Sequence, residues 1–163
     1  MALYLIDYEG CVMGLDMYLT AEIYVSEYFE GGKEILEDLK KLDLTKRLNG
    51  KQIKKISVEV GYWRKANEIH KWFVDNVQDG VDDCKRSYVS REQLQELLDI
   101  VERVLAEPEL GPELLPTEGG FFFGGTDYDE FYIQDLEETK KIIQNILNDS
   151  VFNGWDFYYQ SSW

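Results

Sequence analysis

The chain has 163 residues, of which 44% are hydrophobic and 14% aromatic, and its formal net charge is −15. The length suits one domain, and the apolar fraction excludes an intrinsically disordered chain. The longest apolar runs span only a few residues, so we expect neither a transmembrane helix nor a signal peptide. Two cysteines make no disulfide framework, and a cytoplasmic setting is the expected one.

The charge is distributed unevenly along the chain. Residues 1–32 hold six acids and no bases, residues 33–71 hold eleven bases and six acids, and residues 72–163 hold six bases and twenty acids. A modestly basic segment is therefore set in a strongly acidic body. A negative field repels nucleic acids and membrane surfaces and attracts basic partners, although acidity also serves solubility alone.

Residues 15–25 alternate between apolar and polar side chains, which predicts a half-buried strand of an antiparallel sheet. The outer face of this strand is expected to hold Asp16, Tyr18, Thr20, Glu22 and Tyr24. A glycine pair follows, and the spacing of the next apolar residues predicts a short helix over 33–42. A second alternating segment predicts a strand over 56–62.

The stretch from Gly61 to Val77 holds the single histidine, His70, and two of the four tryptophans. Its spacing is typical of a helix with three faces. The core face would hold Ala66, Ile69, Phe73 and Val77; the adjacent face Trp63, Asn67, His70 and Val74; and the water-facing side Arg64, Glu68, Lys71 and Asp75. This stretch could be a site or only a well-packed core helix.

A polar loop is expected after Val77. Its carboxylates suggest a calcium loop, but counting from Asp75 places Val77 at position 3 and Arg86 at position 12, where an EF-hand needs oxygen ligands. We therefore predict no metal site there. Cys84 follows two aspartates, whose charge disfavours a thiolate nucleophile.

The second half of the chain predicts two helices and two strands. Ser90 and Gln93 form a capping box at the start of a helix that ends near Ala106. The acidic segment 127–148 has helical spacing, with its acids near the N-terminal end as the helix dipole favours. Three phenylalanines between glycine pairs predict a short strand over 120–124.

The aromatic tail also has the pattern of a strand, over 152–160. Its Tyr158-Tyr159 pair and an exposed Trp163 are expected to pack on the sheet edge or to form a partner surface. Together these elements predict one α+β domain, in which a small antiparallel sheet of three or four strands is packed by about four helices.

Three functional classes remain open from the residues. No catalytic residue or motif is identified, and a hydrolase would have to rely on His70 alone. A small nucleotide could be bound by rings and polar donors at Tyr62, Trp63, Arg64, Asn67 and His70. A basic partner could be bound by the acidic surface of Asp79, Asp82, Asp83, Asp127, Asp129, Glu130, Glu137 and Glu138.

Six stretches of the chain resemble a family of small acidic proteins of bacteriophages and prophages. They are M-G-L-D-M-Y-L at 13–19, Y-W-R-K-A-N-E-I-H-K-W-F-V at 62–74, Q-D-G-V-D-D-C at 78–84, Y-V-S-R-E-Q-L at 88–94, E-L-L-P-T-E-G-G-F-F-F-G at 113–124 and D-Y-D-E-F-Y-I-Q-D-L at 127–136. Met13 resembles the usual start, so residues 1–12 are expected to be an extension before a domain spanning 13–163. The family carries no established mechanism, and the resemblance implies only a phage or prophage context.

In that context we expect a non-enzymatic protein that inhibits a host defence system. By analogy of charge and size with anti-CRISPR inhibitors, its acidic surface would imitate DNA and occupy the basic nucleic-acid channel of a defence nuclease. No cofactor, metal, direct nucleic-acid contact or membrane contact is expected, and the oligomeric state is left open.

Overall fold

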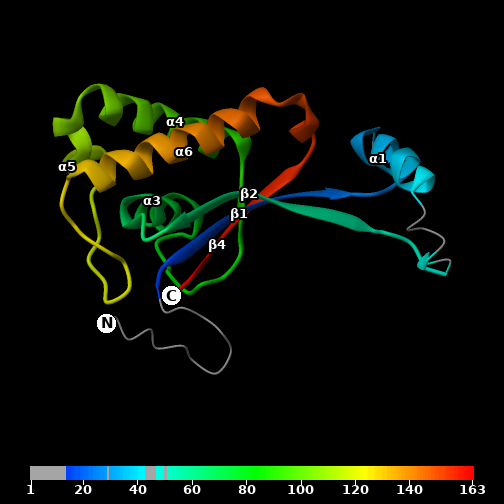
Figure 1. The fold of residues 1–163 in the computed structure, drawn as a ribbon, viewed down its shortest axis with the longest axis horizontal. Coiled ribbons are helices and arrows are strands. Elements are labelled where there is room, and N and C mark those ends of the chain that lie inside the picture. The colour runs from blue at the N-terminus through cyan, green and yellow to red at the C-terminus, as the bar shows by residue number, and fades with distance from the viewer. Residues whose placement is uncertain (1–13, 29, 43–46, 50) are drawn as a thin grey trace, which may run out of the picture.

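The computed structural model describes residues 14–28, 30–42, 47–49 and 51–163 (Figure 1). The elements are β1 (Asp16–Tyr24), α1 (Glu30–Lys41), β2 (Lys55–Arg64), α3 (Asn67–Val77), β3 (Ser87–Val89), α4 (Arg91–Ala106), η1 (Pro108–Leu110), α5 (Gly111–Leu114), α6 (Glu130–Asn148), η2 (Ser150–Phe152) and β4 (Asp156–Ser162). The chain is a single α+β domain, as the sequence predicts. The expected extension 1–12 lies outside the described residues.

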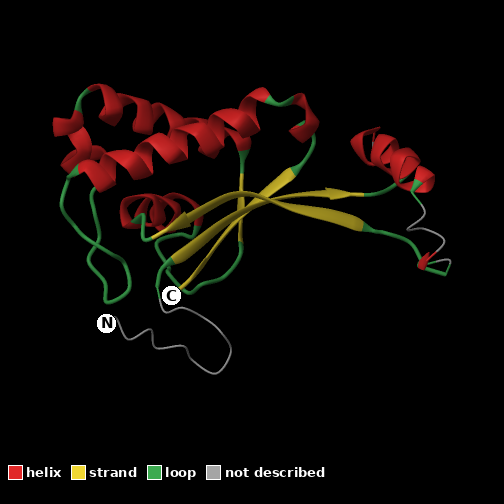
Figure 2. Ribbon diagram, in the orientation of Figure 1, coloured by secondary structure: helices red, strands yellow, loops and turns green. Residues whose placement is uncertain are grey.

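The four strands form one antiparallel sheet in the order β2-β1-β4-β3. The core lies between one face of this sheet and helices α3, α4 and α6, which Figure 2 shows on the same side of the strands. The β1–β2 hairpin extends beyond this body and has α1 at its far end. Helices thus cover only one part and one face of the sheet.

The sheet register places tyrosines on the outer face of the sheet, which the described helices α3, α4 and α6 do not cover. Tyr18 is paired with Tyr62 on one side and Gln160 on the other, and Thr20 is paired with Tyr158, which in turn is paired with Tyr88. Paired residues point to the same face, so these rings share the outer face with Asp16 and Glu22. The alternation expected for residues 15–25 is confirmed.

The expected helix over Gly61–Val77 is wrong in its first part. β2 continues to Arg64, Lys65 adopts a left-handed conformation (φ 64°), and the helix begins only at Asn67. The N–H of Lys65 donates to the carbonyl of Leu15 (2.8 Å), which fixes this turn to the start of β1. Trp63 is therefore a strand residue, because pairing with β1 outweighs its helical spacing.

The expected strand over 120–124 is also wrong. These residues form a turn in which the N–H of Phe123 donates to the carbonyl of Gly120 (3.2 Å), and Gly124 has a φ of 93°. The fourth strand is instead β3, inside the segment expected to be a loop. With only three residues, β3 is too short to show an alternating pattern.

The tail forms a strand, but it begins at Asp156 and not at residue 152, because residues 150–152 form η2, and it does not lie at the sheet edge. β4 lies between β1 and β3, and Tyr159 is fully buried. Its ring stacks on Phe73 of α3, with the centroids 4.0 Å apart. The pairing of β4 with two strands is a long-range choice that the tail's own residues do not reveal. Trp163 is exposed, as expected.

Candidate functional site

The five residues proposed for nucleotide binding do not converge on one cavity. Tyr62 lies on the outer face of the sheet and bonds to Asp16, whereas its neighbour Trp63 points into the core. The indole N–H of Trp63 donates to the hydroxyl of Thr139 on α6 (2.8 Å). The hydrogen bond to Asp16, with partial burial, raises the pKa of Tyr62 to about 12, so this phenol remains a donor.

Asn67 holds the phenylalanine loop in place. Its side-chain amide donates to the carbonyls of Phe123 (3.0 Å) and Gly125 (2.8 Å), and its side-chain oxygen accepts from the N–H of Glu118 (2.7 Å). Asn67 is buried, so these three bonds satisfy most of what the amide offers. This residue orders the loop beside α3, and its amide is already engaged.

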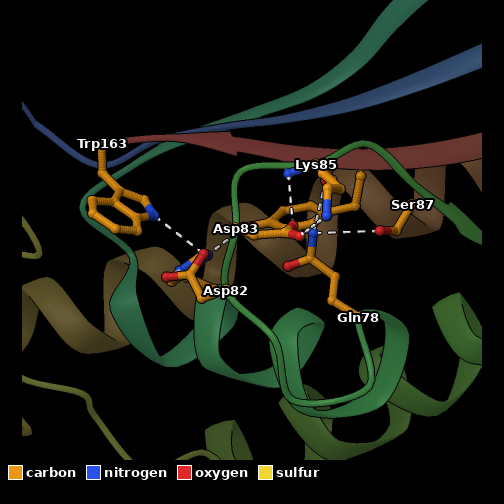
Figure 3. A network of polar contacts seen from close by, with 8 residues as sticks. Gln78, Asp82, Asp83, Lys85, Ser87 and Trp163 are labelled. Atoms are coloured by element: carbon orange, nitrogen blue, oxygen red, sulfur yellow. Dashed lines mark hydrogen bonds and ion pairs between the residues drawn. The ribbon is translucent and has the colours of Figure 1, made fainter.

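His70 lies at the centre of a buried polar chain. Its Nδ1 is 2.7 Å from the hydroxyl of Tyr159, and its Nε2 is 3.0 Å from the carboxylate of Asp82. Asp82 also accepts from the indole N–H of Trp163 (3.1 Å), which Figure 3 shows pointing at it. A neutral ring that donates from Nε2 and accepts from Tyr159 satisfies every group, and burial raises the pKa of Tyr159, which keeps its proton.

This order of hydroxyl, imidazole and carboxylate resembles a nucleophile with its base. However, both His70 and Tyr159 have no exposed area, so solvent reaches neither group in this structure. These hydrogen bonds instead connect three segments that are distant in the sequence: α3, the loop before β3, and the end of β4. We interpret them as structural bonds that hold the C-terminal strand in place.

The other polar side chains of the loop 78–87 bond mostly to groups within the same loop. Asp83 forms an ion pair with Lys85, whose hydrogen bond lowers the pKa of that carboxyl. Gln78 donates to the carbonyl of Lys85 (2.9 Å) and to Ser87 (3.4 Å), as Figure 3 shows. Of the three loop aspartates in the expected acidic surface, only Asp79 is exposed without such a contact.

The acids around α6 have the opposite environment. The carboxylates of Asp127, Asp129, Glu130, Glu137 and Glu138 are all on exposed residues. Asp129 caps the helix by accepting the N–H groups of Phe131 (2.9 Å) and Tyr132 (3.3 Å). Within the described part of the chain, Glu130, Glu137 and Glu138 form no ion pair. They line a surface groove of about 650 Å³ with Phe131, Gln134 and Lys141.

Asp135 registers the local negative field. It is half-buried behind this surface, and its pKa is raised to about 6 by burial and by the charges of Glu138 and Asp129. Burial is the larger cause, and repulsion from the two neighbouring carboxylates adds to it.

The predicted exposure of Glu68 is wrong. It was expected on the water-facing side of α3, but only 3% of it is exposed. Its Oε1 has no hydrogen-bond partner, and burial raises its pKa to about 8, with a further contribution from Asp135. Asp135 and Tyr132 of α6 lie close enough to Glu68 to interact with it electrostatically, and this proximity cannot be deduced from the helical spacing of α3 alone.

A second cavity, of about 270 Å³, lies where the β2–α3 turn meets the start of α6. It is lined by Arg64, Lys65, Asn67, Gly124, Gly125, Asp127, Asp129, Phe131, Tyr132 and Asp135. It brings Arg64 and Asn67, from the proposed nucleotide site, together with Asp127 and Asp129, from the proposed acidic surface. Sequence reasoning missed Lys65 and Asp135, because neither belongs to a motif.

No protein-family model, curated protein or solved structure matches the chain. No helix in the described ranges is long and apolar enough to cross a membrane. Nor do three or more His, Cys, Asp or Glu side chains of those ranges gather in a geometry that could hold a metal ion.

Proposed function

We propose that this chain is a non-enzymatic binding protein whose acidic α6 surface engages a basic partner. The observation that carries the proposal is the groove of Glu130, Glu137 and Glu138, whose carboxylates are exposed and form no ion pair with a described residue, although Lys141 lines the same groove. Unneutralised carboxylates on a rigid helix attract a cationic surface and lose little conformational entropy on binding.

An exposed aromatic ring in the groove supports a protein partner. Phe131 is 66% exposed between these acids, and Tyr128, 42% exposed, lies before the helix. Aromatic rings are enriched at the centres of protein interfaces, and polar and charged groups surround them at the rim. The combination fits a partner with basic side chains around an apolar contact.

The partner class follows from the resemblance to phage proteins, and it is part of the proposal. A defence nuclease of the bacterial host offers a basic channel that binds DNA, and an acidic helix occupying it excludes the nucleic acid. The chain would then act in the host cytoplasm as a DNA mimic of the anti-CRISPR type.

The test is inhibition of DNA cleavage by nucleases purified from a phage-sensitive host. The wild-type chain is compared with a triple variant, Glu130→Lys, Glu137→Lys and Glu138→Lys. The matched control reverses three exposed acids elsewhere, Glu96→Lys, Asp99→Lys and Glu109→Lys, and so has the same net charge. We expect the wild type and the control to inhibit and the α6 variant to lose inhibition. Equal inhibition by both variants would disprove the proposed surface.

A further inference from the structure

The 270 Å³ cavity at the β2–α3 turn has the size of a small metabolite. A water molecule occupies about 30 Å³ of liquid, so the volume holds roughly nine waters, or a molecule of about that many heavy atoms. Most of the lining side chains are polar or charged, and two aromatic rings, Phe131 and Tyr132, complete the wall.

The positive groups come from the β2–α3 turn, where Arg64 and Lys65 line the cavity. Nη2 of Arg64 and Cε of Lys65 lie 3.3 and 3.7 Å from the position that a Cβ atom would occupy on Gly14, so the two side chains meet beside that residue. Both side chains are exposed, and neither forms an ion pair with a described residue.

The negative groups come from the other wall, at the start of α6. Asp127, Asp129 and Asp135 line the cavity there. Glu68 does not line the cavity but lies close to this wall, because Asp135 contributes to the raised pKa of Glu68 and Glu68 contributes to the raised pKa of Tyr132.

The backbone around the cavity is shaped for close approach. Lys65 has a φ of 64°, and Gly124, with a φ of 93°, packs against it. A Cβ atom on Gly124 would lie 3.1 Å from Cβ of Lys65 and 3.2 Å from its carbonyl oxygen, so a side chain there would push the two walls apart. A residue other than glycine in the left-handed backbone conformation costs conformational energy, and such residues cluster at functional sites.

We propose that this cavity binds a zwitterion of amino-acid size, an α-amino acid. Arg64 and Lys65 hold its carboxylate, and Asp135 with Asp127 holds its ammonium group. A nucleotide or free phosphate would be repelled by three aspartates, and a simple cation by Arg64 and Lys65, so only a ligand with both charges satisfies both walls. The proposal goes beyond the α6 surface and does not depend on it.

The test is isothermal titration calorimetry of the full chain against each standard L-amino acid at neutral pH. We expect saturable binding of at least one of them. Its N-acetyl derivative and its carboxamide derivative, which each lack one charge, should bind at least about tenfold more weakly. The absence of binding by every amino acid, or equal binding of the two derivatives, would overturn the proposal.

Variants connect the binding to the cavity. Arg64→Gln and Asp135→Asn should each weaken the affinity by about tenfold or more, whereas Arg103→Gln and Asp99→Asn, at exposed positions of α4, should leave it unchanged. Circular dichroism checks that each variant is folded, and Asp127→Asn replaces Asp135→Asn if the latter unfolds. Unchanged affinity in the folded cavity variants would refute the site. The α6 lysine variant should retain the amino acid even where it loses nuclease inhibition, so the two proposals fail separately.

Discussion

Two acidic segments of this chain look alike in sequence and differ in structure. The loop 78–87 holds Asp82 and Asp83, whose carboxylates accept from His70 and Trp163 or pair with Lys85. The α6 segment holds Glu130, Glu137 and Glu138, which form no ion pair within the described residues. The first set stabilises the fold, and the second is left for solvent or a partner.

The difference shows what a count of charges conceals. A carboxylate that gains donors in the folded state stabilises that state, whereas a carboxylate among other carboxylates opposes it. The pKa of Asp135 is raised to about 6 by burial and, in addition, by the charges of Glu138 and Asp129, whereas the hydrogen bond from Lys85 lowers the pKa of Asp83.

The largest effect is expected from Asp82→Ala. It removes the acceptor of both His70 and Trp163 and leaves a fully buried imidazole N–H unpaired, which should cost about 3 kcal/mol of unfolding free energy. Asp83→Ala in the same loop loses an exposed ion pair and the hydrogen bond from the N–H of Lys85, and should cost much less than Asp82→Ala. Urea unfolding measures both, and equal losses would show that the buried chain is not special.

Glu68→Gln should give the next largest effect, and its sign depends on pH. The folded-state pKa, about 8, lies above the ordinary value of 4.5, so the folded chain holds this proton more tightly. The resulting stability is present below about pH 4.5 and lost as the pH rises to about 8. The difference between the two pKa values corresponds to about 4 kcal/mol at pH 8, and the cost of burying the Gln amide offsets part of it. Glu68→Gln should therefore be more stable than the wild type by roughly 2 kcal/mol at pH 8 and by much less at pH 5. Parallel pH profiles of the two proteins would contradict the buried position of this carboxyl.

A smaller effect is expected when the α6 surface is neutralised. The triple variant Glu130→Gln, Glu137→Gln and Glu138→Gln should change the unfolding free energy by no more than about 0.5 kcal/mol, because exposed groups without ion pairs contribute little. Any gain should appear at low salt and vanish at high salt, since it reflects relief of repulsion. Thermal melts at two salt concentrations measure it; a large loss of stability would show that these acids have structural partners.

The smallest effect concerns a single ionisation. Glu138→Gln removes a neighbouring charge that raises the pKa of Asp135, so that pKa should fall below its value of about 6, by less than one unit. An NMR titration of the Asp135 carboxyl carbon measures the shift. Glu92→Gln on α4 serves as the control, and an equal change in that variant would exclude a local field.

Several features of the fold could be predicted from the sequence. Alternation at 15–25 and 56–62 predicts β1 and β2, and the Ser90–Gln93 capping box predicts the start of α4; both are confirmed. These signals are local, because burial on one side of a strand or helix leaves a period in its own residues. For the same reason the core residues Ala66, Ile69 and Phe73 were predicted correctly, although the helix begins later than expected.

The candidate site was predicted only in part. Arg64, Asn67, Asp127 and Asp129 were named from the sequence, but for two separate sites, and Lys65, Asp135 and Glu68 were not identified as its members. No motif joins them, since the cavity forms only where the β2–α3 turn meets the start of α6. Glu68 lies on a face of α3 whose polar residues are typical of an exposed surface. Its burial depends on residues of α6, which are distant in the sequence.

The sequence alone therefore determined the fold class, the acidic charge, and the strands and helices whose periods are long enough to read. Three features depend on tertiary contacts: the position of β4 inside the sheet, the end of β2 at the Lys65 turn, and the set of carboxylates that accept hydrogen bonds or form ion pairs. The physical reason is the range of the interactions. Periodicity records contacts along one element, whereas the pairing of a carboxylate depends on segments that are distant in the chain and meet only after folding.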